Sequence, residues 1–168
     1  MRVMANQPQT EADAVVQQLL LDALDLVHTH DGWIEDLPKA LRGVKASQAA
    51  WKPDADTPSI WEITLHLNQW LEDLIRDLRH EEAPKPEDWP PVTEVSEEAW
   101  DTLVMRTMDN TKDLRGLVSA LTREDLLHPA AGRKTPIFSH LISILVHDAY
   151  HSGQIVKMRQ IMKSQGIK

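Results

Sequence analysis

Two histidines near the end of the chain, His147 and His151, stand four residues apart in the segment HDAYH. On a helix this spacing places both imidazoles on one face, separated by about 40° around the helix axis. Two side chains placed in this way can bind one metal ion. A single inward-facing histidine would more simply be a hydrogen-bonded core residue, but a pair with this spacing favours a metal site.

The helix that carries this pair is predicted to begin near Pro136 and to continue almost to the end of the chain. Three histidines, His140, His147 and His151, fall on its apolar face. The apolar residues of that face are Ile137, Ile144, Ile155, Met158 and Met162. Buried imidazoles are costly unless each has a partner, and a metal ion would satisfy two of them. His140 lies two turns before His147, so we expect it to line the pocket or support a ligand.

A third histidine, His66, is a candidate ligand from another helix. Residues 59–80 predict this helix, which begins with the capping box Ser59-x-x-Glu62. His66 lies at the edge of the apolar stripe, one turn before Trp70. That position is typical of a ligand that faces an open cleft, and equally of an ordinary boundary histidine. A shared site requires this helix to be a neighbour of the last one.

Four long helical segments are predicted, with shorter pieces between them. The long segments begin near Thr10, Ser59, Ser96 and Pro136, and a short amphipathic piece lies over residues 33–44. This pattern predicts an all-α, up-down four-helix bundle with short extra helices, as a single domain over residues 10–168 after a flexible tail over residues 1–9. The proline-rich residues 81–95 are too long for a tight hairpin, and we expect them to cross one end of the bundle and form part of a pocket wall.

Composition limits the function classes. The chain has 168 residues, a formal net charge of −8 and no cysteine. The negative charge argues against partners such as nucleic acid or an anionic membrane. Without cysteine, a metal ion must be bound through nitrogen and oxygen atoms. No apolar run approaches the ~20 residues that span a bilayer. Residues 1–10 lack the pattern of a signal peptide, so a cytoplasmic location is expected.

Three further positions are interpreted as ordinary surface residues. His28 follows the predicted first helix as a cap or surface histidine, with the alternative that it lines a pocket. Arg133 and Lys134 lie in a basic loop, where solvated charge is the simpler interpretation and contact with an anionic substrate is the alternative.

Three sequence blocks occur in order. The first is SIWE from Ser59, followed by His66-Leu67 and Trp70; the second is DWP at residues 88–90; the third is HLI from His140 with HDAYHSGQI from His147. Together they resemble the DinB-like superfamily over most of the chain. The resemblance implies a four-helix bundle that holds one divalent metal ion through His66, His147 and His151. It also implies frequent homodimers, and relatives among thiol-dependent transferases, isomerases and hydrolases. Because the superfamily does not share one reaction, the resemblance does not specify the chemistry.

Three neutral imidazoles would leave at least one coordination position open, which is the pattern of a catalytic site. Zinc or nickel suits such ligands best, and iron is a further possibility. The open position could activate water or hold the thiolate of an external small thiol. Asp148 is a candidate catalytic residue, since His147-Asp148-x-x-His151 is similar to the HExxH of zinc peptidases. Its alternative roles are a hydrogen-bond acceptor for a ligand or a surface charge.

Three side chains near these histidines are candidate pocket residues. Gln154, one turn after His151, could orient a ligand or a substrate, or could simply pack. Tyr150 and Trp70 belong to the same sequence blocks and are expected to line the pocket.

The sequence therefore supports a mononuclear divalent-metal-dependent enzyme that acts on a small molecule, either as a hydrolase or as a small-thiol-dependent transferase. One alternative is a non-catalytic metal-binding or stress-response bundle. Another is a metal-free helical interaction domain in which the histidines are core residues.

Overall fold

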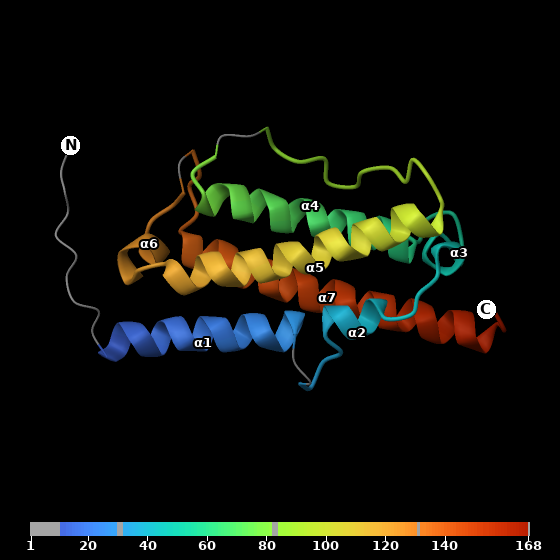
Figure 1. Ribbon diagram of the computed structural model, residues 1–168, viewed down its shortest axis with the longest axis horizontal. Coiled ribbons are helices and arrows are strands. Elements are labelled where there is room, and N and C mark those ends of the chain that lie inside the picture. Colours follow the sequence, from blue (N-terminus) through green and yellow to red (C-terminus); the bar gives the residue numbers. More distant parts are fainter. Residues whose placement is uncertain (1–10, 30–31, 82–83, 131, 168) are drawn as a thin grey trace.

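The computed structural model describes residues 11–29, 32–81, 84–130 and 132–167. Over these residues the chain forms four long helices, α1 (Glu11–His28), α4 (Ile60–Leu78), α5 (Glu97–Ala120) and α7 (Ile137–Ser164) (Figure 1). The shorter helices are α2 (Leu37–Leu41), α3 (Ala46–Ala49) and α6 (Arg123–Leu127). The predicted all-α bundle with short extra helices is confirmed. The predicted tail over residues 1–9 lies outside the described residues.

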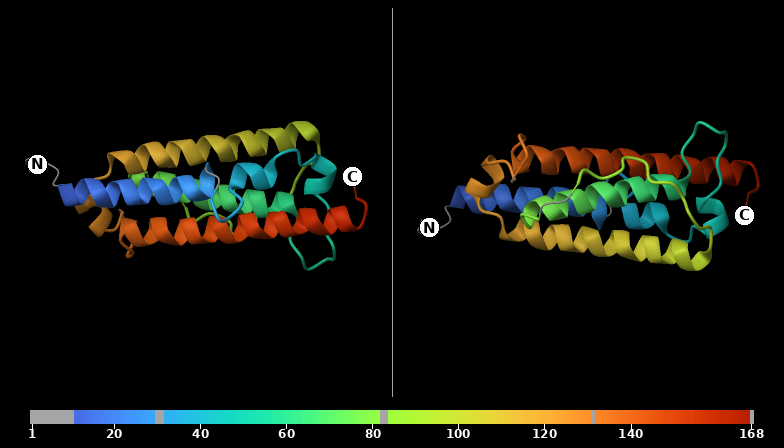
Figure 2. Two further views of the ribbon diagram at one scale, coloured as in Figure 1. Left: turned by 90° about the horizontal axis from the view of Figure 1, so that it is seen from below. Right: turned by 90° about the horizontal axis from the view of Figure 1, so that it is seen from above.

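The four long helices form a closed ring of neighbours. α4 packs against α5 and α7, and α1 packs against the same two helices from the other side (Figure 2). α4 and α7 are therefore neighbours, as a site shared by His66, His147 and His151 requires. In the described part of the chain, no helix combines the length and apolar character needed to cross a membrane.

The helix directions depart from simple up-down order. α4 and α5 run in the same direction, because the segment that joins them returns along the length of the bundle (Figure 1). We expected this proline-rich segment to cross one end of the bundle, but residues 84–95 lie alongside α4 instead (Figure 2). A proline-stiffened chain extends by about 3 Å per residue, so a segment of this length can span a helix of about 28 Å.

The start of α4 follows from its local sequence. The Ser59 hydroxyl accepts a hydrogen bond from the backbone N–H of Glu62 at 3.1 Å, and Glu62 Oε2 accepts one from the backbone N–H of Ser59 at 2.7 Å. The predicted capping box is thus formed and satisfies two N–H groups that the first helical turn leaves free. This cap fixes where α4 begins and, with it, the height of His66 in the bundle.

The core consists of two apolar clusters. One contains residues of α1, the second half of α4 and the start of α7, and the other contains residues of α2, α3, the first half of α4 and the end of α7. On α7 the first cluster ends at Leu145 and the second begins at Ile155. The stretch between them supplies His147, Asp148, His151 and Ser152, of which the last three are buried. A polar layer therefore separates the two halves of the core.

Candidate metal centre

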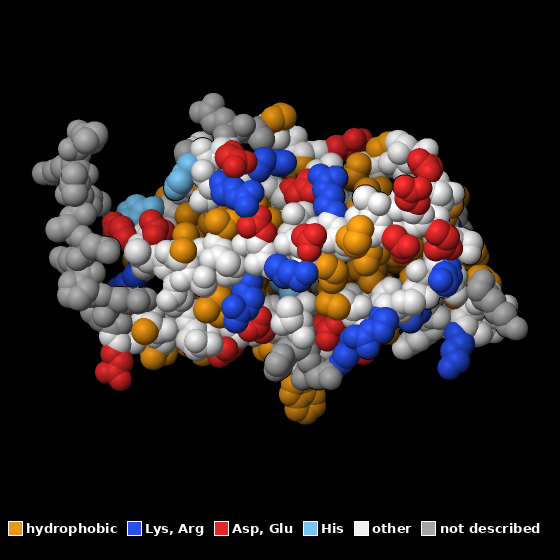
Figure 3. Space-filling view, viewed as in Figure 1, with side chains coloured by type: hydrophobic (Ala, Val, Ile, Leu, Met, Phe, Trp, Pro, Cys, Tyr) orange, Lys and Arg blue, Asp and Glu red, His pale blue; other side chains and the backbone are white. Residues whose placement is uncertain are grey.

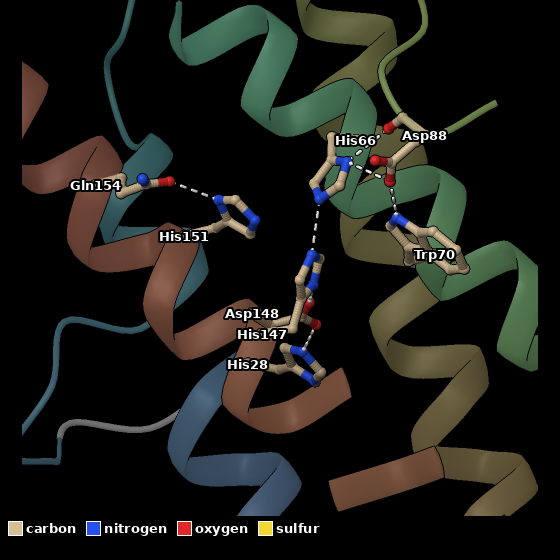
Figure 4. A network of polar contacts seen from close by, with 8 residues as sticks. All are labelled: His28, His66, Trp70, Asp88, His147, Asp148, His151 and Gln154. Carbon is tan, nitrogen blue, oxygen red and sulfur yellow. Dashed lines mark hydrogen bonds and ion pairs between the residues drawn. The ribbon is translucent and has the colours of Figure 1, made fainter. Parts of the chain in front are cut away.

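Three histidines from two helices converge in this polar layer, His66 from α4 and His147 and His151 from α7 (Figure 4). Their ring centroids are 4.8 Å apart for His66–His147, 4.8 Å for His66–His151 and 4.4 Å for His147–His151. One ring nitrogen of each lies within 4.8 Å of the others, an arrangement that could hold a metal ion. The spacing of His147 and His151 and the edge position of His66 account for this convergence.

Each of the three rings is hydrogen-bonded through Nδ1 to an oxygen acceptor. These bonds run from His66 to the carbonyl oxygen of Asp88 (2.5 Å), from His147 to Asp148 Oδ1 (3.1 Å) and from His151 to Gln154 Oε1 (2.6 Å). Because carbonyl, carboxylate and amide oxygens can only accept, each Nδ1 carries a proton. In the neutral form of such a ring, Nε2 keeps the lone pair that can bind a metal ion.

The Nε2 atoms of His66 and His147 face one another at 2.7 Å. Two lone pairs this close repel each other unless a proton or a cation lies between them. Three neutral imidazoles with free Nε2 atoms are the donor set that zinc and nickel prefer. The hydrogen bonds at Nδ1 therefore orient the three rings in a way that could hold a metal ion.

Burial keeps two of these rings neutral. It is the largest effect on His66, and it lowers the pKa of this imidazole below its ordinary value of 6.5. Burial, followed by the proximity of His147, lowers the pKa of His151 to about 4. A metal ligand must be unprotonated, so proton competition with a metal at His66 and His151 is weak near neutral pH.

Asp148 links the centre to α1. Its side chain is 0% exposed, and its two oxygens contact His147 Nδ1 at 3.1 Å and His28 Nε2 at 2.8 Å. Burial alone would raise the pKa of Asp148, but hydrogen bonds from His147 and His28 lower it further than burial raises it. Both oxygens are occupied by histidine nitrogens and the side chain is fully buried, so the arrangement favours a positioning role over a catalytic one.

His28 is a site residue that the sequence pattern indicates only as an alternative. The simpler interpretation, a cap or surface histidine, is wrong, because His28 is the last residue of α1, is 2% exposed and contacts Asp148. Its place one turn after Leu24, on the buried row of α1, is the signal for the alternative.

One wall of the centre is formed by the proline-rich segment beside α4, as expected from the sequence. The Trp89 ring stacks on the His66 ring at 4.0 Å with an interplanar angle of 10°. The indole Nε1 of Trp70 donates a hydrogen bond to Asp88 Oδ1 at 3.0 Å (Figure 4). Trp70 thus supports the segment that supplies the carbonyl group for His66.

The centre opens along α7. His66 and His151 are buried, but the His147 side chain is 27% exposed and the neighbouring Tyr150 is 62% exposed. Gln154 Nε2 donates a hydrogen bond to the Tyr150 hydroxyl at 2.9 Å, so these two of the four predicted pocket residues lie together at this edge. Among the described residues, no fourth histidine or carboxylate belongs to the group.

His140 does not lie at this centre. Its Nδ1 is 3.4 Å from Asp77 Oδ2, in a separate cluster with Asp73. The guanidinium of Arg133 lies in the same cluster, with Nη2 2.6 Å from Asp73 and Nε 2.8 Å from Asp77. His140 shares a helix face with His147, but seven residues separate them by about 10 Å along the axis. Arg133 is an ion-pair partner of α4 and not the solvated charge expected from the sequence.

In a comparison with protein-family models, residues 28–155 match the model of the DinB superfamily. The matched range includes all three converging histidines, His28 and the wall segment. The chain belongs to the DinB superfamily. Searches of curated proteins and of solved structures found no match.

Proposed function

We propose that this protein is a mononuclear, divalent-metal-dependent enzyme that acts on a small molecule, by hydrolysis or by transfer to a small thiol. The observation that carries the proposal is the convergence of three Nε2 atoms from His66, His147 and His151, each ring being held at Nδ1 by an oxygen acceptor. A structural metal site is normally closed by four protein ligands. Three candidate ligands with one exposed edge at His147 support the catalytic pattern instead.

The residues around the centre have separable tasks in this proposal. The Asp88 carbonyl, Asp148 and Gln154 fix the ring orientations, and Trp89 covers one face of His66. A divalent metal held by these rings would supply Lewis acidity at the open position. A small molecule would approach along α7, past Tyr150.

A transfer reaction would need an external thiol, because the chain contains no cysteine. In this proposal the thiol would bind at the open position, beside the partly exposed His147. Hydrolysis would need only water at the same position, so the two reactions differ in the co-substrate and not in the residues used.

Cobalt-loaded protein tests the open position. We expect a small thiol such as 2-mercaptoethanol to change the visible absorption spectrum of the wild-type protein and to add a thiolate-to-cobalt charge-transfer band. His147→Ala, which removes the most exposed of the three histidines, should bind less cobalt and lack this response. A wild-type spectrum that changes neither with thiols nor with pH would indicate a closed site and contradict the proposal.

Catalysis itself requires a turnover measurement. Zinc- or nickel-loaded protein should turn over at least one member of two panels, small electrophiles with a thiol or small esters and amides without one. The activity should disappear with His147→Ala and with a chelator. Metal-loaded protein that turns over no compound in either panel would support a non-catalytic metal-binding bundle instead.

A further inference from the structure

A second candidate site lies between α2 and the last turns of α7. It is a groove with a volume of about 920 Å³, and none of the three converging histidines lines it. This volume is within the range of about 300–1,000 Å³ that is usual for small-molecule sites. Its position on a different face of α7 makes it independent of the metal centre.

The groove is basic in an acidic protein. The chain has 26 acidic and 18 basic residues, but among the described residues the groove is lined by four basic side chains and by one acidic side chain, Glu35. The basic residues are Lys39, Arg42, Arg159 and Lys163. Lys and Arg side chains gather over α2 and the end of α7 in Figure 3. The local field therefore favours an anion.

One of these cations is held in place by the backbone. Arg159 Nη1 donates hydrogen bonds to the carbonyl oxygens of Lys39 at 2.9 Å and Ala40 at 2.6 Å. In the described part of the chain, its Nε and Nη2 atoms make no hydrogen bond. These two atoms are a preorganised pair of donors of the kind that binds a carboxylate or phosphate.

Two further cations are not neutralised by the protein. Arg42 and Lys163 are exposed, and among the described residues neither has a carboxylate within 4.0 Å. Cations left without partners at the rim of a hollow are available to an anionic ligand.

The floor of the groove is apolar. Ala40, Val44 and Met162 line it and are at most 6% exposed, and Val156 and Ile167 add half-buried apolar surface. An inorganic anion would leave this floor uncovered, and a neutral hydrocarbon would leave the cations unpaired. A ligand with both a charged head and an apolar body would use both features.

We propose that this groove binds a small amphipathic organic anion. Its carboxylate or phosphate head pairs with Arg42, Arg159 and Lys163, and its apolar body lies on the floor formed by Ala40, Val44 and Met162. The proposal does not depend on the function of the metal centre, so either can fail without the other.

Titration of ¹⁵N-labelled protein with octanoate, and separately with octyl phosphate, tests the groove. We expect saturable amide shifts in α2 and over residues 156–167, without comparable shifts around the three histidines. Octyltrimethylammonium has the same chain and the opposite charge, and it should not bind. Shifts confined to the histidines, no saturable shifts, or equal binding of the cationic compound would overturn the proposal.

Charge-reversal variants distinguish anion binding in the groove from a general effect of the net charge of the protein. The double variant Arg42→Glu with Lys163→Glu should weaken octanoate binding about tenfold or more. The control is Lys134→Glu with Lys157→Glu, which makes the same charge change at exposed residues outside the groove. An equal loss in both double variants would overturn the proposal. If the first variant does not fold, Arg42→Gln with Lys163→Gln makes the same test without charge reversal.

A free small molecule and a lipid headgroup share this chemistry, and our proposal is the free molecule. Cosedimentation with phosphatidylglycerol vesicles distinguishes them. We expect no sedimentation above that of the Arg42→Glu with Lys163→Glu variant. Vesicle binding that requires these two cations, without binding of free octanoate, would contradict the proposal.

Discussion

At the residue scale, the candidate centre depends on acceptors that hold each imidazole at Nδ1. The acceptors are of three kinds, the backbone carbonyl of Asp88, the carboxylate of Asp148 and the amide oxygen of Gln154. Such partners select the tautomer and the orientation of a metal ligand, and removing one typically lowers metal affinity or activity by about 10–100-fold. Asp148 is the most deeply buried of them and is itself held by His28.

Replacing Asp148 by Asn should lower zinc affinity by about 10–100-fold, because an amide is a weaker acceptor for His147 than a carboxylate. Competition with a chromophoric chelator measures this affinity. Asp101→Asn, an exposed change on α5, is the matched control and should leave the affinity unchanged. Wild-type affinity in the Asp148→Asn variant would show that this carboxylate does not support the centre.

The sequence could predict the three histidines but not all of their partners. The four-residue spacing of His147 and His151 and the edge position of His66 are properties of side chains on helices, which periodicity describes well. The partner of His66 is the backbone carbonyl of Asp88, and a carbonyl group has no residue-type signal. His28 reaches Asp148 across 120 positions of sequence, a contact that only the packing of α1 determines.

At the scale of elements, two connections hold α4 in place. The segment beside α4 supplies Asp88 and Trp89, and the connection from α6 to α7 supplies Arg133. Helical periodicity predicts the faces of α4 and α5, but it contains no information about their relative direction. The parallel order of these two helices follows from the path of the proline-rich connection, which sequence reasoning assigned to one end of the bundle.

Arg133→Gln should lower the free energy of unfolding by about 1–3 kcal/mol, because it leaves the buried carboxylates of Asp73 and Asp77 without their main partner. Urea unfolding followed by circular dichroism measures this change. Lys134→Gln alters the exposed neighbouring residue and should have little effect. Equal stability of the Arg133→Gln variant and the wild type would mean that these ion pairs contribute nothing net.

At the scale of the whole molecule, the bundle has a polar layer between two apolar clusters, and this layer opens to solvent beside His147. A layer of histidines without a metal ion makes a bundle sensitive to acid. The pKa of His66 and the pKa of His151 both lie below the ordinary value of 6.5, so the folded state resists their protonation.

The metal-free protein should therefore become less stable as the pH falls from about 6.5 toward 4. In this interval the unfolded chain binds protons that folded His151, with a pKa of about 4, does not, so acid favours unfolding. The contribution of this histidine is at most about 3 kcal/mol. Urea unfolding at pH 7 and pH 5 in the presence of a chelator measures the loss.

Two variants show whether His151 causes this loss of stability at low pH. His151→Gln should show a smaller difference between the two pH values, whereas His128→Gln, at an exposed position, should behave like the wild type. The same acid sensitivity in His151→Gln and wild type would show that this buried imidazole does not contribute to it.

The central claim is that the imidazoles of His66, His147 and His151 share one divalent metal ion. Crystals grown with zinc and measured at the zinc absorption edge test it most directly. The account predicts an anomalous peak about 2.0–2.1 Å from each of the three Nε2 atoms. A zinc-loaded crystal with no peak between these rings, or with its only peak at Asp73, Asp77 and His140, would contradict it.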